Sequence, residues 1–110
     1  MIQSPELRRL ILQHPLIHHL EPAAQERLLA ATLESSHNST TLLIRQGQEA
    51  DRFFLVLKGR VKLFRISADG QEKVVEIIHP GQTFAEAVMF TQKSVYPVCA
   101  ETLEPVHLIS

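Results

Sequence analysis

The chain contains few of the features that mark disulfide-bonded, cluster-binding or membrane-spanning proteins. Its 110 residues include a single cysteine, Cys99, which excludes an internal disulfide and a metal cluster held by four cysteines of one chain. The longest apolar runs, such as 53–57, are far too short to cross a bilayer, and the N-terminus lacks the charged-then-apolar pattern of a secretory signal. We therefore expect a cytoplasmic protein with no membrane partner.

Neither sign of charge dominates. Eleven Lys and Arg residues against 12 Asp and Glu residues give a formal net charge of -1 at pH 7. Proteins that bind nucleic acid usually carry a clustered basic face, so we expect no DNA binding by these residues themselves. The 45% hydrophobic and 21% charged content is typical of one ordinary globular domain, long enough to bury a core.

The first third of the chain predicts two helices. Ser4 is the expected N-cap of a helix over residues 4–12, with Pro5 at its first helical position, and Pro15 ends it. A second helix is expected to begin near Pro22, where apolar residues recur at helical spacing. Its apolar stripe comprises Ala23, Ala24, Leu28, Leu29 and Leu33.

From residue 40 onward the pattern is typical of strands. Runs of β-branched and aromatic residues are separated by turn residues about every 11 positions, which indicates an antiparallel barrel or sandwich. The clearest hairpin signal is Asp69-Gly70, for which we expect a two-residue turn. We predict a mainly β domain with helices in residues 1–33 and a β-roll in residues 34–110. The expected strands are 41–44, 52–57, 61–66, 72–78, 95–103 and 106–109.

One segment interrupts the strands. A turn at Pro80-Gly81 leads to the small residue Ala85, and the apolar spacing over 87–90 suits one or two helical turns that begin at Glu86. The first N–H groups of a helix have no partner within the helix and can meet an anion. The sequence therefore predicts an anion site in this segment.

This segment and the one after it resemble a known motif. Phe84-Ala85-Glu86-Ala87 followed by Tyr96-Pro97-Val98 is similar to the phosphate-binding cassette of cyclic-nucleotide-binding domains in Crp/Fnr-type transcription regulators. That cassette has Phe, a small residue, Glu and an aliphatic residue, and later an Arg-Ser/Thr-Ala triplet. The four glycines also stand where the family has turn glycines. The resemblance covers about Pro15 to Ser110 and implies an antiparallel double-stranded β-helix, or jelly roll, of the cyclic-nucleotide-binding-domain type.

The resemblance also implies roles for the cassette positions. In the family the Glu accepts the ribose 2′-hydroxyl, backbone N–H groups meet the cyclic phosphate, and the Arg neutralises it. Here Glu86 is present, but Tyr96 stands at the Arg position and Pro97 at the Ser/Thr position. Losing a bidentate Arg weakens phosphate binding by roughly two to three orders of magnitude, so we expect no cyclic AMP or cyclic GMP binding at physiological concentration. The ligand-pocket candidates are Phe84, Ala85, Glu86, Ala87, Tyr96 and Pro97.

A simpler alternative exists for Glu86. An acidic residue in the first turn of a helix is stabilised by the helix dipole with no ligand present. The apolar faces of strand 52–57 also leave alternatives open. One face makes the core, and the other packs in the core as well, lines a ligand pocket, or meets the dimerisation helix that the family places there.

Within the family, the chain is similar to the Dnr branch. The shared features are Ala in place of the cassette Gly, Tyr96 at the Arg position, and Gly70-Gln71-Glu72-Lys73 before the next strand. This resemblance implies a response to nitric oxide through haem in a longer parent protein, with no cofactor in this chain alone. Imidazole is the expected axial ligand, and His14 aligns with a histidine of that branch, so His14 is the haem ligand candidate. A capping or loop role is the alternative for His14, and no other metal site is expected.

The family context implies the partners. A dimerisation helix and a helix-turn-helix DNA-binding domain follow the last strand in the family and are absent from this chain, so DNA contact, homodimerisation and a small-molecule or gas effector belong to the whole regulator. The alternatives are a regulatory module of a transporter, channel or kinase, and a ligand-free scaffold domain. We expect no enzyme, because a nucleophile elbow, paired carboxylates and a phosphate loop are all lacking. His79 and His107 are too few for the metal site of cupin enzymes, which share the fold.

Overall fold

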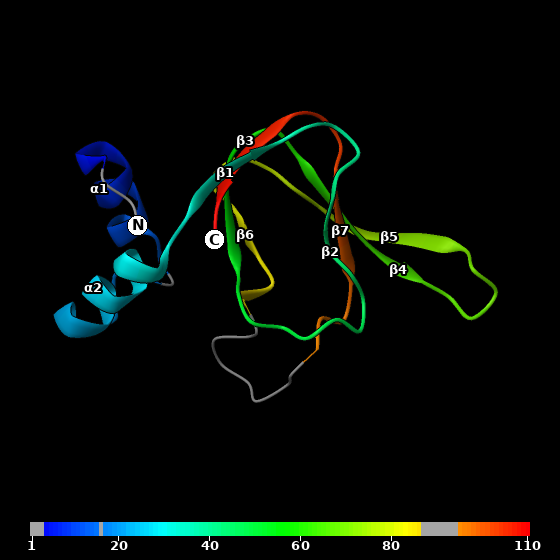
Figure 1. Ribbon diagram of the computed structural model, residues 1–110, viewed down its shortest axis with the longest axis horizontal. Helices are drawn as coiled ribbons and strands as arrows, with labels where there is room; N and C mark the ends of the chain where they lie inside the picture. Colours follow the sequence, from blue (N-terminus) through cyan, green and yellow to red (C-terminus); the bar gives the residue numbers. More distant parts are fainter. Residues whose placement is uncertain (1–3, 16, 87–94) are drawn as a thin grey trace. The chain divides into compact units, whose positions relative to one another are not determined.

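The structure, a computed structural model, describes residues 4–15, 17–86 and 95–110 (Figure 1). Contacts divide the chain into two compact units, residues 1–34 and 35–110. The first unit holds α1 (Pro5–Gln13) and α2 (Pro22–Ala31). Within the described ranges, neither helix has the length and continuous apolar sequence that crossing a bilayer requires.

Helix α1 begins and ends as its sequence indicates. The Ser4 side chain accepts a hydrogen bond from the N–H of Leu7 at 3.3 Å, and Pro5 occupies the first turn, where its missing N–H costs nothing. The helix ends at Gln13. His14 has an extended backbone, with ψ 137°, because a residue that precedes proline is disfavoured in the helical region.

Helix α2 starts at Pro22 as predicted but ends earlier than its apolar stripe suggested. Thr32 is the C-cap, and its hydroxyl donates to the carbonyl of Leu28 at 2.5 Å. Leu33 therefore lies outside the helix, and 55% of its surface is exposed. Leu29 is the buried residue of α2.

The second unit is a β-roll of two four-stranded antiparallel sheets (Figure 1). The first sheet has the order β1-β8-β3-β6 and the second the order β2-β7-β4-β5. The prediction of a mainly β jelly roll with short N-terminal helices is confirmed. The strands are β1 (Glu34–His37), β2 (Leu42–Ile44), β3 (Phe54–Lys58), β4 (Val61–Ile66), β5 (Glu72–Ile78), β6 (Thr83–Phe84), β7 (Cys99–Thr102) and β8 (Val106–Ile109).

Strand bounds agree with the sequence where apolar alternation is strong. β4, β5 and β8 have the predicted limits, but the strand expected over 95–103 is reduced to β7, and Val95 forms only an isolated bridge with Glu49. Pro97 has no N–H to donate to a ladder, which accounts for the break. The sequence analysis missed β1 and β6, because β1 is Glu-Ser-Ser-His and β6 has two residues.

The prediction of a two-residue turn at Asp69-Gly70 is wrong. The N–H of Ser67 donates to the carbonyl of Gln71, and the N–H of Gly70 donates to the carbonyl of Ser67, each at 2.9 Å. The loop therefore has three residues, and of these only Gly70 needs a positive φ, at 83°. The Ser67 hydroxyl and the Gln71 N–H donate to the Asp69 carboxylate, which lowers the pKa of Asp69.

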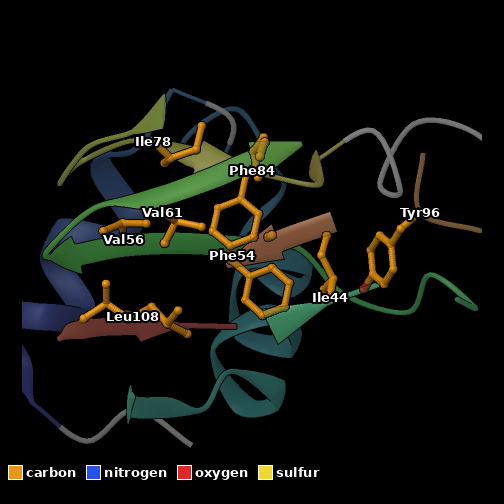
Figure 2. Packing of buried hydrophobic residues seen from close by; sticks show 11 residues of the cluster. Ile44, Phe54, Val56, Val61, Ile78, Phe84, Tyr96 and Leu108 are labelled. Atoms are coloured by element: carbon orange, nitrogen blue, oxygen red, sulfur yellow. The ribbon is translucent and has the colours of Figure 1, made fainter. Parts of the chain in front are cut away.

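A cluster of buried side chains fills the interior between the two sheets (Figure 2). Phe54 and Val56 of β3 belong to it, so their face of the strand makes the core, as predicted. Leu55 between them is also buried, with 4% exposed, on the opposite face. The cluster comprises Ile44, Phe54, Val56, Val61, Leu63, Ile78, Phe84, Tyr96, Ala100, Val106 and Leu108.

An ion-pair network joins three strands of the second sheet. Lys62 of β4 pairs with Glu72 of β5 and, at 3.6 Å, with Glu101 of β7, and its Nζ lies 4.9 Å from the ring centroid of Phe64. The hydrogen bond from Lys62 to Glu72 raises the pKa of Lys62 above its ordinary value of 10.5. A raised lysine pKa adds stability that is present below pH 10.5 and is lost only at higher pH, as Lys62 loses its proton.

The turn between β3 and β4 requires glycine at position 59. Gly59 has φ 80°, and a Cβ there would lie 2.5 Å from the carbonyl oxygen of Pro105 and 2.7 Å from Cγ1 of Val106. We expect Gly59→Ala to lower the free energy of unfolding by about 2–4 kcal/mol, from backbone strain plus overpacking. Denaturant unfolding measures this loss.

Gly70→Ala is the matched control. Gly70 has φ 83°, but a Cβ there meets nothing within 4 Å, so the expected loss is limited to the strain of about 1–2 kcal/mol. Equal losses in the two variants would contradict the argument that close packing against residues 105–106 restricts position 59.

Candidate functional site

The cassette segment starts from a firmly anchored strand. β6 pairs with β3, with Phe84 opposite Phe54, and the two rings stack with centroids 4.7 Å apart and an angle of 10° between their planes. Phe84 is 1% exposed. The turn before it is bonded to β3 as well, since Gly81 donates to the carbonyl of Val56 at 2.8 Å and Val56 donates to that of Gln82 at 3.0 Å. These bonds fix where the chain leaves the sheet.

Ala85 turns the chain out of β6 through an unusual backbone conformation. Its φ is 63°, in the left-handed region that non-glycine residues rarely adopt. Ala85 is partly buried and packs against the core cluster. The position therefore has the geometry for which the cassette pattern uses glycine, and alanine is the smallest other side chain that can take it.

Glu86 follows this turn and is half-buried. No described lysine or arginine forms an ion pair with its carboxylate. The helix expected to begin at Glu86 and the pocket candidate Ala87 lie outside the described residues, as does most of the segment up to Val95. The structure thus describes Glu86 but not the helix expected after it, and the anion site and the role of Glu86 stay predictions.

Tyr96, at the position of the cassette Arg, lies in the core cluster and is 3% exposed (Figure 2). Its hydroxyl donates to the carbonyl of Arg52 at 2.8 Å and accepts from the N–H groups of Arg52 at 3.2 Å and Asp51 at 3.4 Å. Its backbone is bonded too, because Tyr96 donates to the carbonyl of Gln48 and accepts from the N–H of Gly47. Pro97, by contrast, is exposed.

The fold thus brings together some of the expected site residues. Phe84 and Tyr96 belong to one buried cluster, and Ala85 packs against it. Sequence reasoning missed the loop residues Asp51 and Arg52 that hold the Tyr96 hydroxyl, because they are 44 or 45 positions away in the chain. The only available signal was that a buried tyrosine hydroxyl needs a partner.

The haem ligand candidate lies in the first unit. His14 is the half-buried C-cap of α1, and its backbone N–H donates to the carbonyl of Ile11 at 3.1 Å. His18 and His19 are exposed, with ring centroids 3.8 Å apart. Among the described residues, no group of three His, Cys, Asp or Glu side chains is placed to hold a metal ion. His14 thus has the capping position of the simpler alternative, and its role as a haem ligand stays a prediction.

The backbone at Ala85 generates a test. We expect Ala85→Gly to raise the free energy of unfolding by about 0.5–1 kcal/mol, because relief of the left-handed strain outweighs the lost methyl contact and the greater freedom of the unfolded chain. Thermal and denaturant unfolding measure the change. Ala50→Gly is the control, since Ala50 packs against the same core without a positive φ. This variant should lower the free energy of unfolding by an amount of similar size. Equal losses in both variants would refute strain at Ala85.

Comparisons with known proteins agree with this geometry. The family model described as the cyclic nucleotide-binding domain matches residues 36–110. The crystal structure of the sensor domain of the transcriptional regulator DNR from Pseudomonas aeruginosa has a TM-score of 0.85 and 32% sequence identity, and the match covers 94% of this chain and 69% of that one.

Two curated relatives are longer proteins. The cyclic AMP receptor protein of Thermus thermophilus is 28% identical over 92 residues, which are 82% of this chain and 43% of that protein. The cAMP-dependent protein kinase regulatory subunit of Blastocladiella emersonii is 25% identical over 79 residues, 72% of this chain and 20% of that protein. The chain thus spans less than half the length of either. It belongs to the cyclic nucleotide-binding domain family, and its relatives include the Crp/Fnr-type sensor domains, Dnr among them.

Proposed function

We propose that the chain is the effector-sensing domain of a Crp/Fnr-type transcription regulator and that its effector is not a cyclic nucleotide. The observation that supports this is the buried, hydrogen-bonded Tyr96 at the cassette Arg position. A cyclic phosphate carries a negative charge that a neutral phenol does not balance. The hydroxyl is also already bonded to residues 51–52, so it has little capacity left for a ligand.

The mechanism proposed for the whole regulator is a shift between two conformations. An effector that binds one arrangement of the domain more tightly than the other moves the population toward it. In a longer protein this shift would reposition DNA-binding domains joined to the roll. DNA contact and homodimerisation belong to that longer protein. The net charge of -1 supports assigning DNA contact to other domains of the longer protein, because DNA-binding surfaces are usually basic.

Calorimetry with cyclic AMP tests the proposal. We expect no binding at micromolar concentration, since loss of the Arg fork costs roughly two to three orders of magnitude in affinity. The double variant Tyr96→Arg with Pro97→Ser should bind at least about tenfold more tightly than the unmodified chain. The control is Tyr96→Lys with Pro97→Ser, which supplies the charge without the bidentate fork and should gain less. Circular dichroism checks that each variant folds. Micromolar binding by the unmodified chain would overturn the proposal.

A haem-mediated response to nitric oxide is a second candidate, which the similarity to the DNR sensor domain supports. His14 is the proposed axial ligand, and the bound iron would supply the gas-binding site. Titration of haem into the full-length regulator should produce a Soret band that shifts with nitric oxide. His14→Ala should remove or shift that band, whereas His19→Ala, which changes an exposed neighbour, should leave it unchanged. The reverse result would exclude His14.

Two further alternatives make different predictions. A regulatory module of a transporter, channel or kinase agrees with the similarity to a kinase regulatory subunit, and the sequence of the complete protein would identify it. A ligand-free scaffold predicts that no effector changes the oligomeric state or DNA affinity of the complete protein. DNA-binding measurements with and without nitric oxide separate the scaffold from a sensor.

A further inference from the structure

The side chain of Tyr96, at the cassette Arg position, lies in the interior of the roll. Tyr96 is 3% exposed and belongs to the cluster that includes Ile44, Phe54 and Phe84. In Figure 2 its ring lies at one edge of that cluster. A buried tyrosine contributes a large apolar area, and its hydroxyl requires a polar partner.

That partner is the loop between β2 and β3. The hydroxyl accepts from the N–H groups of Asp51 and Arg52, and its proton is shared between the carbonyl of Arg52 at 2.8 Å and the carboxylate of Asp51 at 3.4 Å. A phenol oxygen has one proton and two lone pairs, so two accepted bonds and one shared proton use its full capacity. No buried side-chain nitrogen or oxygen is without a partner in the described part of the chain. The Tyr96 hydroxyl therefore has its hydrogen-bond partners with no ligand present.

Backbone contacts of Val95 and Tyr96 reach the same loop. Tyr96 and Val95 pair with residues 47–49 through two hydrogen bonds and an isolated bridge. Ala50, in the same loop, packs against the core cluster. One side chain and its own backbone thus hold the loop over residues 47–52 against the end of the roll.

We propose that Tyr96 is a built-in occupant of the cassette compartment: its phenol fills the space and makes the polar bonds that a bound ligand would otherwise make. The inference rests on the proposed function in that it concerns the same site. It goes further by assigning a chemical class, because the compartment without this side chain is complementary to a small neutral phenol. It follows that an effector that binds among these described side chains displaces the Tyr96 ring.

The first test needs no substitution. The chain has one tyrosine and no tryptophan, so all intrinsic tyrosine fluorescence reports on Tyr96. We expect acrylamide to quench this emission with a Stern–Volmer constant several-fold below that of free N-acetyltyrosinamide, and to approach the free value in denaturant. Equal quenching of the folded chain and the free compound would overturn the proposal.

The second test replaces the side chain by an added ligand. Tyr96→Ala should have a lower Tm, and 4-methylphenol at about ten times its dissociation constant should raise that Tm by roughly 5 °C. The unmodified chain should show no such rise. Toluene, which has the same ring and methyl group without the hydroxyl, should stabilise the variant less, because it leaves the polar groups of residues 51–52 unpaired.

Leu108→Ala is the matched control, since Leu108 is a fully buried member of the same cluster with no polar group to replace. Its cavity should show no preference for 4-methylphenol over toluene. If Tyr96→Ala is unfolded alone, 4-methylphenol should restore its circular dichroism, and failure to do so counts against the proposal. An equal response of both variants to both compounds would also refute it. Neither test involves a nucleotide, so micromolar cyclic AMP binding would refute the proposed function separately.

Discussion

Strand β3 is the constraint on which the rest of the roll depends. It pairs with β8 on one side and with β6 on the other, and its residues Phe54 and Val56 enter the core cluster. The Phe54 ring stacks on Phe84 at the start of the cassette segment, and the residue two positions before β3, Arg52, holds the Tyr96 hydroxyl. Both ends of the cassette are therefore positioned by one strand and the loop that leads into it.

The physical contrast at the site is between a charged ligand and a neutral side chain. A pocket for cyclic phosphate keeps a cation in place and leaves its donors free for the ligand. At the position that the family resemblance gives to the Arg, Tyr96 is 3% exposed, and an unpaired charge in such a buried place would be costly. Two residues that remain from the cassette pattern, Phe84 and Ala85 with its left-handed backbone, pack in or against the core cluster.

Much of the fold could be predicted, because apolar alternation and turn residues are local signals. They gave the bounds of β4, β5 and β8 and the start of both helices. The errors have local causes as well. β1 has no apolar alternation, and Pro97 interrupts the strand expected over 95–103. The loop at Asp69-Gly70 has three residues instead of the predicted two, and only Gly70 in it adopts a positive φ.

The sequence by itself determined the fold class, the family resemblance and the missing Arg, since these depend on residue types and on spacing along the chain. Only the tertiary structure decided that Tyr96 points into the core and that Asp51 and Arg52 are its partners. Those contacts join positions 44 and 45 residues apart, and no local pattern specifies them. The bonds of a buried hydroxyl are set by whichever backbone groups the folded chain brings within about 3 Å of it.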